Sequence, residues 1–358
     1  MNEYERRLQQ STRESCKKEF ATRESSIMES TTHTPSLVSP AQNIPLANTL
    51  SFATVDVFTT TPFKGNQLAV VRIPSDLASN LSQEMKQTIA CEFSFSETVF
   101  LHDPSISHNQ RRLDIFTVSK ELPFAGHPII GAACYVCQNL DTDIDQITMS
   151  CKAGLIACRY DRKEKLVEVE IPHNVHNHSH TISGRAVLKT QPYLARTSVA
   201  TSELPVVSPL KGLTFILINL PSIIPHLEKL EAGAGVDTSS VKLDEGWEPS
   251  FVGCYFYVIA SHPTERVQKL RTRMLEPRVG EDAATGSAAC TLACYLALKD
   301  GRHGRVYQYI IEQGIEMGRA SEIHVTVTLG AEGKTVHSVV LAGRAVLVTE
   351  GSLHLPQN

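Results

Sequence analysis

The chain has 358 residues, of which 42% are hydrophobic and 20% are charged, and its formal net charge at pH 7 is −4. This size and composition predict a globular protein with one large or two medium hydrophobic cores. The slightly acidic balance provides no basic surface for nucleic acid, and no segment approaches the roughly 18–20 consecutive apolar residues of a membrane-spanning helix.

Residues 1–50 are rich in Ser, Thr, Glu and Arg and poor in large apolar side chains, so we expect a disordered N-terminal tail. The tail has no signal-peptide core, and its glutamates argue against a transit peptide. The nine cysteines are odd in number and mostly lie among apolar residues. They predict the reduced thiols of a cytoplasmic protein instead of a disulfide framework.

The folded part is expected to begin at SFATVDVF, in which polar and apolar residues alternate as in a strand. Strands are predicted in this half over residues 51–58, 67–73, 96–102 and 112–117. A helix with Ser79 or Asn80 as its N-cap is predicted over 79–93, and a second helix follows Pro128. The segments QITMSCKAGLIACRYD and KLVEVEIP then predict a hairpin-like pair of strands.

A polar, His-rich stretch from about 173 to 195 separates this half from a second one of similar style. The elements predicted there are strands over 213–220 and 255–260, a helical stretch near 222–233 and further strands near the C-terminus. The expected division is an N-terminal lobe over 51–180, a C-terminal lobe over 181–345, and a strand end over 346–358 that returns to the first lobe.

The two halves share an internal repeat, in which residues 111–136 align with residues 271–296 at one constant offset and without a gap. The identical pairs are Arg111/Arg271, Glu121/Glu281, Gly126/Gly286, Ala133/Ala293, Cys134/Cys294 and Tyr135/Tyr295. In each copy a strand-like segment leads to a Glu, and a turn at Gly then opens a helix. Two such halves would aim two helix N-termini, with their N–H groups and positive dipole ends, at one small anionic molecule between them.

The helices of the repeat, GAACYVC and SAACTLACYLAL, are apolar on nearly all faces, which is typical of a helix that is buried on every side. The expected fold class is α+β. We predict two pseudo-symmetric lobes, each formed by a curled, barrel-like and mainly antiparallel sheet around one central helix.

Glu97 is the first candidate catalytic residue. It stands between Ser96 and Thr98 at the start of a predicted strand, and apolar residues flank it in the segment FSFSETVF. Desolvation in such surroundings would raise the pKa of its carboxyl toward the range of a general acid–base. The alternative is a glutamate on the outer face of a strand, in keeping with the usual preference of Glu for the surface.

Polar side chains at the two helix starts are candidates for ligand binding. His127 follows Gly126 in the first repeat, where its ring could bond a ligand held by the same turn. Asp282 and Ser287 lie at the equivalent turn of the second repeat, and the step from Gly286 to Ser287 would present backbone N–H groups to a carboxylate or phosphate. In both turns a plain helix cap is the alternative.

Three other patterns carry less weight. The first is a group of histidines in the polar stretch, His173, His176, His178 and His180. They lack a partnering Cys pair, so we expect no metal there. Cys134 and Cys137 form a CxxC inside an apolar helix, where packing is favoured over redox chemistry. The glycines near 232–235 lack the strand and helix context of a nucleotide site.

Five segments, in this order, resemble the phenazine-biosynthesis PhzF-like proteins: VDVFTTTPFKGNQLAVV, FSETVFL, RLDIFTVSKELPFAGHPIIGAA, EPRVGEDAATGSA and QGIEMGRASEI. The resemblance covers about residues 52–350. It implies the diaminopimelate-epimerase-like fold, with two pseudo-symmetric lobes, an active site between them and usually a homodimer. It also implies that neither a cofactor nor a metal takes part.

The best-understood member of that family is a trans-2,3-dihydro-3-hydroxyanthranilate isomerase, which moves a proton along a dihydroaromatic ring with one Glu as acid–base. The resemblance assigns this role to Glu97 and substrate contacts to His127, Asp282 and Ser287. Related epimerases use a pair of cysteines at the two helix starts, and this chain has none there. One departure is Ala283, where the family usually has Pro, and it could loosen that turn.

These inferences together predict a cofactor-independent isomerase of a small cyclic carboxylate, which the backbone N–H groups at Gly126 and Gly286 would hold. Two alternatives stay open. One is an epimerase or another proton-transfer enzyme of specialised metabolism. The other is a non-catalytic small-molecule-binding protein of the same fold, although the presence of all four polar positions argues against it.

Overall fold

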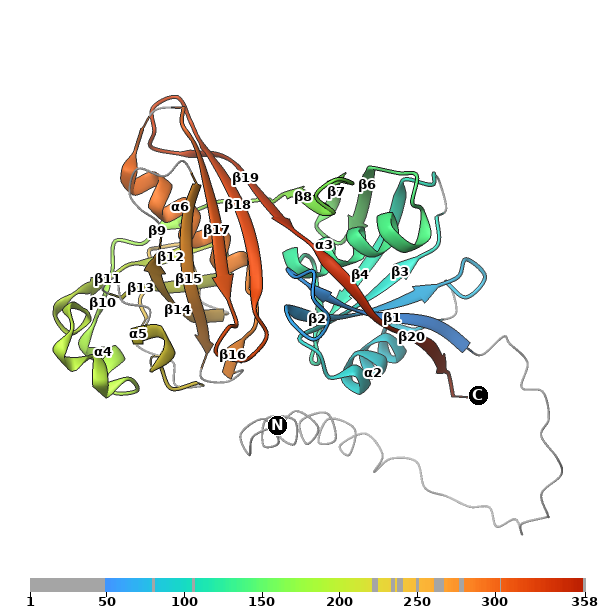
Figure 1. Ribbon diagram of the computed structural model, residues 1–358, viewed down its shortest axis with the longest axis horizontal. Coiled ribbons are helices and arrows are strands. Elements are labelled where there is room, and N and C mark those ends of the chain that lie inside the picture. Colours follow the sequence, from blue (N-terminus) through green and yellow to red (C-terminus); the bar gives the residue numbers. More distant parts are fainter. Residues whose placement is uncertain are drawn as a thin grey trace, which may run out of the picture.

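The computed structural model describes residues 49–78, 81–104, 107–220, 225–232, 236, 241–248, 251–260, 267–276, 280–302 and 304–356. Residues 1–48, in which a disordered tail is expected, lie outside these ranges, and the first strand begins at Thr49. The strands gather in two groups on opposite sides of the molecule (Figure 1). None of the described helices combines the length and the apolar character needed to cross a membrane.

The first strand group contains the N-terminal strands and the last strand of the chain. Its members are β1 (Thr49–Val57), β2 (Asn66–Ile73), β3 (Glu97–His102), β4 (Gln110–Phe116), β5 (Glu121–Leu122), β6 (Gln146–Cys151), β7 (Gly154–Asp161), β8 (Leu166–Glu170) and β20 (Ala345–His354). They are hydrogen-bonded in the order β20-β1-β2-β3-β4-β6-β7-β8, with β5 added to β4. The pairs β2–β3 and β4–β6 are parallel and the others are antiparallel.

The second strand group contains β9 (His176–Asn177), β12 (Val206–Leu210), β13 (Leu213–Asn219), β14 (Phe251–Ile259), β15 (Val267–Glu276), β16 (Gly280–Asp282), β17 (Val306–Gln313), β18 (Ser321–Leu329) and β19 (Val336–Gly343). Their order is β19-β18-β17-β15-β14-β13-β12-β9, with β16 added to β15. Beside this group lie a small sheet of β10 (Ile182–Ser183) and β11 (Glu203–Leu204), the short helices α4 (Arg185–Leu188) and α5 (Pro225–Glu228), and two 3₁₀ turns (Pro192–Arg196 and Ser198–Thr201).

One pairing, β8 with β19, joins the two groups into a single mixed and mainly antiparallel sheet. Among the described residues no pairing links its two end strands, β20 and β9, so the sheet is not closed by hydrogen bonds. The barrel-like, pseudo-symmetric form of the lobes and their residue limits therefore stay predictions.

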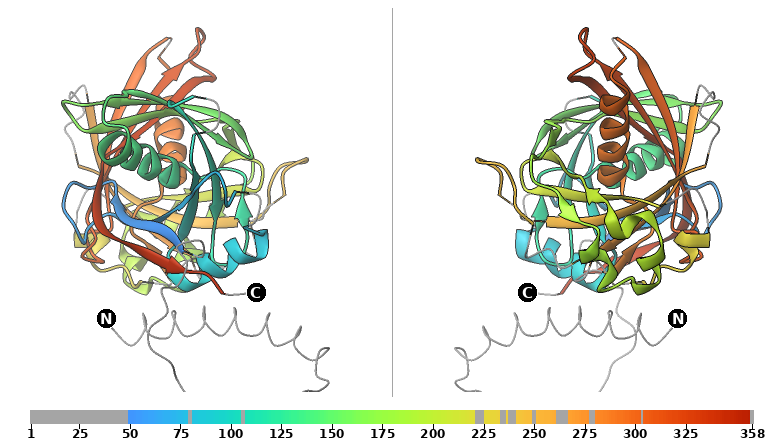
Figure 2. Two further views of the ribbon diagram at one scale, coloured as in Figure 1. Left: turned by 90° about the vertical axis from the view of Figure 1, so that its right-hand side faces the viewer. Right: turned by 90° about the vertical axis from the view of Figure 1, so that its left-hand side faces the viewer.

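Each group holds one apolar helix, and both helices begin at the glycine that the repeat predicts. These helices are α3 (Gly126–Tyr135), which continues as a π-helical turn (Val136–Leu140), and α6 (Gly286–Asp300). Nine of the ten residues of α3 and nine of the fifteen residues of α6 are buried, most of them in one large hydrophobic core. Helix α3 packs against β1, β8 and β20, and α6 packs against β12, β18 and β19. The end-on views of Figure 2 show strands passing on several sides of both helices.

The structure corrects three local predictions. The helix predicted over 79–93 is α2 (Gln83–Phe93), which begins later than expected because Ser82 is its N-cap. The Ser82 side chain accepts a hydrogen bond from the backbone N–H of Met85. The predicted caps Ser79 and Asn80 lie outside the described residues. The helical stretch near 222–233 contributes only the four residues of α5 to the described chain. The predicted hairpin-like pair is a three-stranded meander, β6-β7-β8, because the chain turns sharply between Cys151 and Gly154.

Candidate active site

The starts of α3 and α6 converge on one side chain. A Cβ atom at Gly126 would lie 2.7 Å from Cδ2 of Leu341, and one at Gly286 would lie 3.1 Å from the same atom. Within the described chain, neither N-cap residue, Ala125 or Thr285, forms a side-chain cap on its helix. The first-turn N–H groups of two helices, with their positive dipole ends, therefore meet in one region, as the repeat predicts.

Glu97 and His127 form an ion pair at this region. Glu97 is the first residue of β3, and His127 is the second residue of α3. The start of the strand and the start of the helix therefore bring the two side chains together. His127 Nδ1 lies 3.1 Å from Oε2 of Glu97, whose side chain is 19% exposed. The other ring nitrogen of His127, Nε2, is buried and has no hydrogen-bond partner among the described residues. A polar ligand atom could satisfy it.

The pKa of Glu97 differs from the sequence-based prediction. Burial raises the pKa of this carboxyl, as expected, but the hydrogen bond and positive charge of His127, together with a hydrogen bond from Ser96, outweigh burial and hold the pKa below its usual value. The prediction of a raised pKa is therefore wrong, because it did not include the histidine partner. Glu97 is ionised at neutral pH and is suited to accept a proton.

Asp282, at the end of β16, carries the raised pKa instead. Burial, with a further contribution from the negative charge of Glu97, raises the pKa of Asp282 to about 6, against hydrogen bonding from Thr285. Its Oδ1 accepts a hydrogen bond from Nδ2 of Asn66 at 3.0 Å, and its Oδ2 accepts one from the Thr285 hydroxyl at 2.6 Å. Two carboxyls of one site thus have pKa values displaced in opposite directions, a pattern typical of acid–base sites.

Two amide side chains position this cluster, and the sequence analysis did not single them out. Asn66, at the start of β2, also donates to the carbonyl of Ala284 at 2.9 Å and so ties the first strand group to the second. Gln313, at the end of β17, donates to the carbonyl of Asp282 at 2.8 Å and to the hydroxyl of Thr285 at 3.0 Å. Both residues lie in the segments that carry the family resemblance, at Gly-Asn and Gln-Gly steps that predict only turns.

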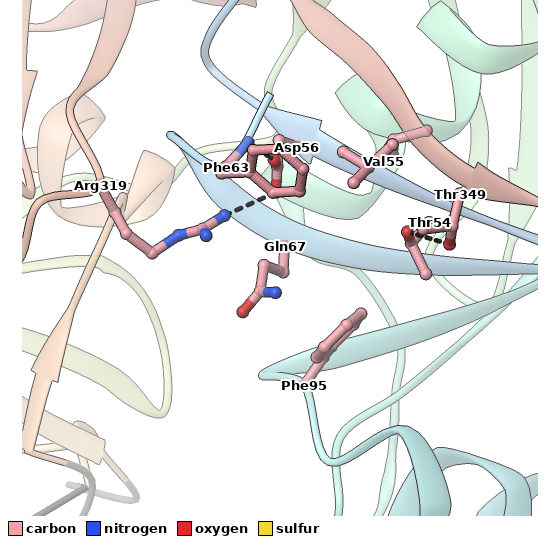
Figure 3. A pocket seen from close by; sticks show the side chains of 9 residues that line it. Thr54, Val55, Asp56, Phe63, Gln67, Phe95, Arg319 and Thr349 are labelled. Atoms are coloured by element: carbon pink, nitrogen blue, oxygen red, sulfur yellow. Dashed lines mark hydrogen bonds and ion pairs between the residues drawn. The ribbon is translucent and has the colours of Figure 1, made fainter. Parts of the chain in front are cut away.

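A cavity of about 250 Å³ is lined in part by Gln67, which follows Asn66 of the cluster in the sequence, and by Phe95, and both side chains face it (Figure 3). At its rim Arg319, from the loop between β17 and β18, forms an ion pair of 2.5 Å with Asp56 of β1 and so bridges the two strand groups. Because successive strand residues face opposite sides, Asn66 points away from the cavity that Gln67 lines. This cavity is not lined by Glu97, His127 or Asp282, so the cleft between two lobes stays a prediction.

The sequence of the chain matches the model of a known protein family. The model of the family described as phenazine biosynthesis-like protein matches residues 55–351. The chain belongs to this family.

Relatives agree with the assignment, and a solved structure has a similar fold. A trans-2,3-dihydro-3-hydroxyanthranilate isomerase of Pseudomonas aeruginosa is 30% identical over 313 residues, which cover 85% of this chain and 99% of the relative. An uncharacterized isomerase of Mesorhizobium japonicum is 28% identical over 86% of this chain and 99% of the relative. The fold is similar to that of a PhzF-family protein of Bacillus anthracis, with a TM-score of 0.67 at 20% identity over 86% of this chain and 99% of that one. Like these relatives, this member of the phenazine biosynthesis-like family is an isomerase.

The turn at Ala283 is packed closely against residues from other segments. The carbonyl of Ala283 accepts a hydrogen bond from the Ser321 hydroxyl at 3.0 Å, and a Cβ atom at Gly314 would come within 2.5 Å of the same carbonyl oxygen. Gly314 has a positive φ of 74°, so a glycine is required there both by conformation and by space.

The predicted substrate-binding residue Ser287 lies in the first turn of α6, one residue beyond Gly286, and is half-buried.

The cysteines of the two helices lie several residues beyond the helix starts, in the core. The eight cysteines in the described ranges are all free. Burial raises the pKa of Cys290 to about 12 and that of Cys137 to about 11. Cys134 and Cys294 are also buried, and burial raises the pKa of both thiols. Because the reactive form of a cysteine is the thiolate, these thiols are poor proton acceptors at neutral pH.

The raised pKa of Asp282 predicts a specific dependence of stability on pH. Between about pH 4 and pH 6 the folded protein retains a proton on Asp282 that the unfolded chain has released, so the free energy of unfolding should fall as the pH rises through this window. We expect a decrease of about 1–3 kcal/mol in urea unfolding of the wild type. Asp282→Asn should lack this decrease, and an equal decrease in the variant would contradict the assignment.

Proposed function

We propose that the protein is a cofactor-independent isomerase that moves a proton between two carbons of a small cyclic carboxylate, with Glu97 as the acid–base. The observation that carries the proposal is the Glu97–His127 pair at the point where two helix starts converge. Glu97 has a lowered pKa and is ionised, so its carboxylate can remove a proton from a ring carbon. The same carboxyl would return the proton to a second carbon.

The electrostatics of the region favour the anion that forms when the proton leaves. The first-turn N–H groups at Gly126, Gly286 and Ser287 would hold the substrate carboxylate and stabilise the negative charge that develops on the ring. Such preorganised donors are most effective where water is excluded. The half-buried position of Glu97 supports this role, because few water molecules can compete for the proton.

The remaining side chains would orient the substrate. Nε2 of His127 is buried without a partner in the described chain and is suited to a polar substituent of the ring. Asp282, whose pKa is raised to about 6, would bond a hydroxyl or amino group and could share a proton with it near neutral pH. The Ser287 hydroxyl would contact the carboxylate at the start of α6.

We further infer that the two strand groups are pseudo-symmetric, barrel-like lobes with the limits 51–180 and 181–345, except that β9 (His176–Asn177) pairs with β12 and so belongs with the second lobe. The repeat supports this division, because α3 and α6 begin at equivalent glycines and are buried in equivalent ways. The bonds of Asn66 to Asp282 and Ala284 and of Arg319 to Asp56 cross between the groups. An opening and closing of the lobes would require these bonds to be broken and reformed.

The substrate class follows from the relatives and from the chemistry of the site. Two anion-binding helix starts fit a single carboxylate, and one ionised acid–base fits a reaction that begins with proton removal. The Pseudomonas relatives are trans-2,3-dihydro-3-hydroxyanthranilate isomerases, so this compound is the first substrate to test, followed by related cyclic carboxylates.

The test is an isomerisation assay in deuterium oxide, followed by NMR. We expect the wild type to convert the dihydrohydroxyanthranilate or a related cyclic carboxylate and to introduce one solvent deuterium at the carbon that receives the proton. Cys290→Ala and Cys294→Ala should retain this activity within about threefold, because both thiols are buried packing groups. Loss of activity in a well-folded Cys→Ala variant would favour a two-thiol mechanism instead.

A further inference from the structure

A second cluster of polar side chains, with atoms that could bind a metal ion, lies at β9, an end strand of the sheet. None of its residues belongs to the proposed isomerase site. His176 and His178 are on and next to β9, and Asp244 comes from a segment 66 residues further on. The ligand atoms of these three residues lie within 4.8 Å of one another. The sequence analysis expected no metal here, because the histidines lack a partnering Cys pair. Asp244 is distant in sequence, and only the fold brings it to the histidines.

We propose that His176, His178 and Asp244 bind one divalent transition-metal ion, with Zn²⁺ as the best-fitting ion. Two imidazoles and one carboxylate are ligands that zinc accepts readily. Zinc bonds of about 2.0–2.2 Å place the ligand atoms of a tetrahedral site roughly 3.4 Å apart. Here His176 Nε2 lies 2.8 Å and His178 Nδ1 lies 3.8 Å from Oδ2 of Asp244, so small side-chain rotations create the site.

His178 is held in the tautomer that a ligand requires. Its Nδ1 accepts a hydrogen bond of 3.1 Å from the backbone N–H of Asp244, so this nitrogen carries the lone pair of the ring and no proton. Its Nε2 therefore donates to the Ser208 hydroxyl at 2.9 Å, and Ser208 is linked in turn to Thr214 at 2.8 Å. A metal-binding histidine usually donates its second nitrogen in this way.

The surroundings fix the other ligands. Trp247 stacks on His176 with ring centroids 4.8 Å apart and 15° between the planes. Ser179 donates to Asp244 through its backbone N–H and its hydroxyl, which orients the carboxylate. The exposed His180, whose Nδ1 lies 3.5 Å from Asp244, is available as a fourth ligand. A metal would replace the proton between His176 and Asp244 and the hydrogen bond from the Asp244 N–H, and would fasten the segment 241–248 to β9.

The test uses the full chain without a histidine tag, treated with EDTA and dialysed, and Zn²⁺ as the probe. We expect calorimetry to give one Zn²⁺ per chain with micromolar or tighter affinity. Trp247 is the single tryptophan of the chain, so its fluorescence reports on this site directly. Ni²⁺ should quench that fluorescence with the same stoichiometry.

Matched variants distinguish this cluster from other metal-binding groups. Asp244→Asn and His176→Gln should each weaken Zn²⁺ binding at least tenfold, and zinc should raise the melting temperature of the wild type but not of Asp244→Asn. His324→Gln is the control, because His324 also pairs with a carboxylate, Glu322, at 2.7 Å but belongs to no group of three metal-ligating side chains within the described ranges. Circular dichroism checks that each variant is folded. Unchanged Zn²⁺ affinity in both cluster variants, or no stoichiometric binding by the wild type, would overturn the proposal.

Discussion

Glu97→Gln is expected to reduce isomerisation by about 10²–10⁴-fold while substrate binding is retained. The amide keeps the shape of the side chain and an oxygen that can accept the hydrogen bond from His127, so the substrate pocket should be unchanged. It cannot accept and return a proton, so deuterium exchange from solvent should fall with the isomerisation rate. The measurements are turnover and deuterium incorporation by NMR, together with calorimetric binding of the substrate.

The control for this prediction is Glu92→Gln. Glu92 is exposed on α2, five residues before Glu97, and makes no contact with the site residues described here. Its replacement by Gln should leave rate and binding unchanged. If Glu97→Gln retained full activity, the acid–base role would have to be given to another group, and Asp282 with its raised pKa would be the next to test.

Glu281→Ala is expected to lower the free energy of unfolding by about 3–5 kcal/mol and the melting temperature by about 5–10 °C. Glu281 lies next to Asp282 in β16 and accepts two hydrogen bonds from Arg273, at 2.7 and 2.6 Å. The side chains of Arg273 and Glu281 are only 3% and 6% exposed. Removing the carboxylate leaves a buried guanidinium without its counter-charge, which is costly because water cannot replace the lost partner.

The internal repeat provides the matched control for this stability prediction. Glu121 occupies the position equivalent to Glu281, but its partner is Lys152, whose side chain is 57% exposed. An ion pair of that kind contributes less than about 1 kcal/mol, so Glu121→Ala should be nearly neutral. Replacing both members of the buried pair, as Arg273→Met with Glu281→Leu, should recover part of the stability. Equal losses in Glu281→Ala and Glu121→Ala would show that burial of the pair does not determine its contribution.

The difference between these two glutamates illustrates what equivalent sequence positions do not reveal. The repeat aligns Glu121 with Glu281 and Arg111 with Arg271. In the structure Arg111 pairs with Asp141 and Arg271 pairs with Glu316, while Glu281 binds Arg273, which lies outside the aligned identities. The repeat thus predicts the backbone of the two turns but not the charge partners, because the partners come from different elements in each half.

The residue pattern alone determined the local structure that underlies the site. The residue pattern predicted β1 from its alternation of polar and apolar residues and β2 and β3 as further strands, and the all-apolar helices predicted that α3 and α6 are buried. The Gly126 and Gly286 turns, repeated in the sequence, predicted two helix starts that meet, and one atom of Leu341 lies close to both glycines. These features depend on periodicity and backbone conformation, which neighbouring residues encode.

Only the tertiary structure decided which side chains act on one another. Asn66 and Gln313 reach Asp282 from strands that lie 216 and 31 residues away along the chain, so no local pattern could identify them. The pKa of Glu97 is lowered because His127 lies 3.1 Å from its carboxylate, and the sequence predicted only the effect of burial. Asp244 likewise comes from a remote segment of the chain to lie beside His176 and His178. Electrostatic effects fall off steeply with distance, and distances between remote residues are set by the fold.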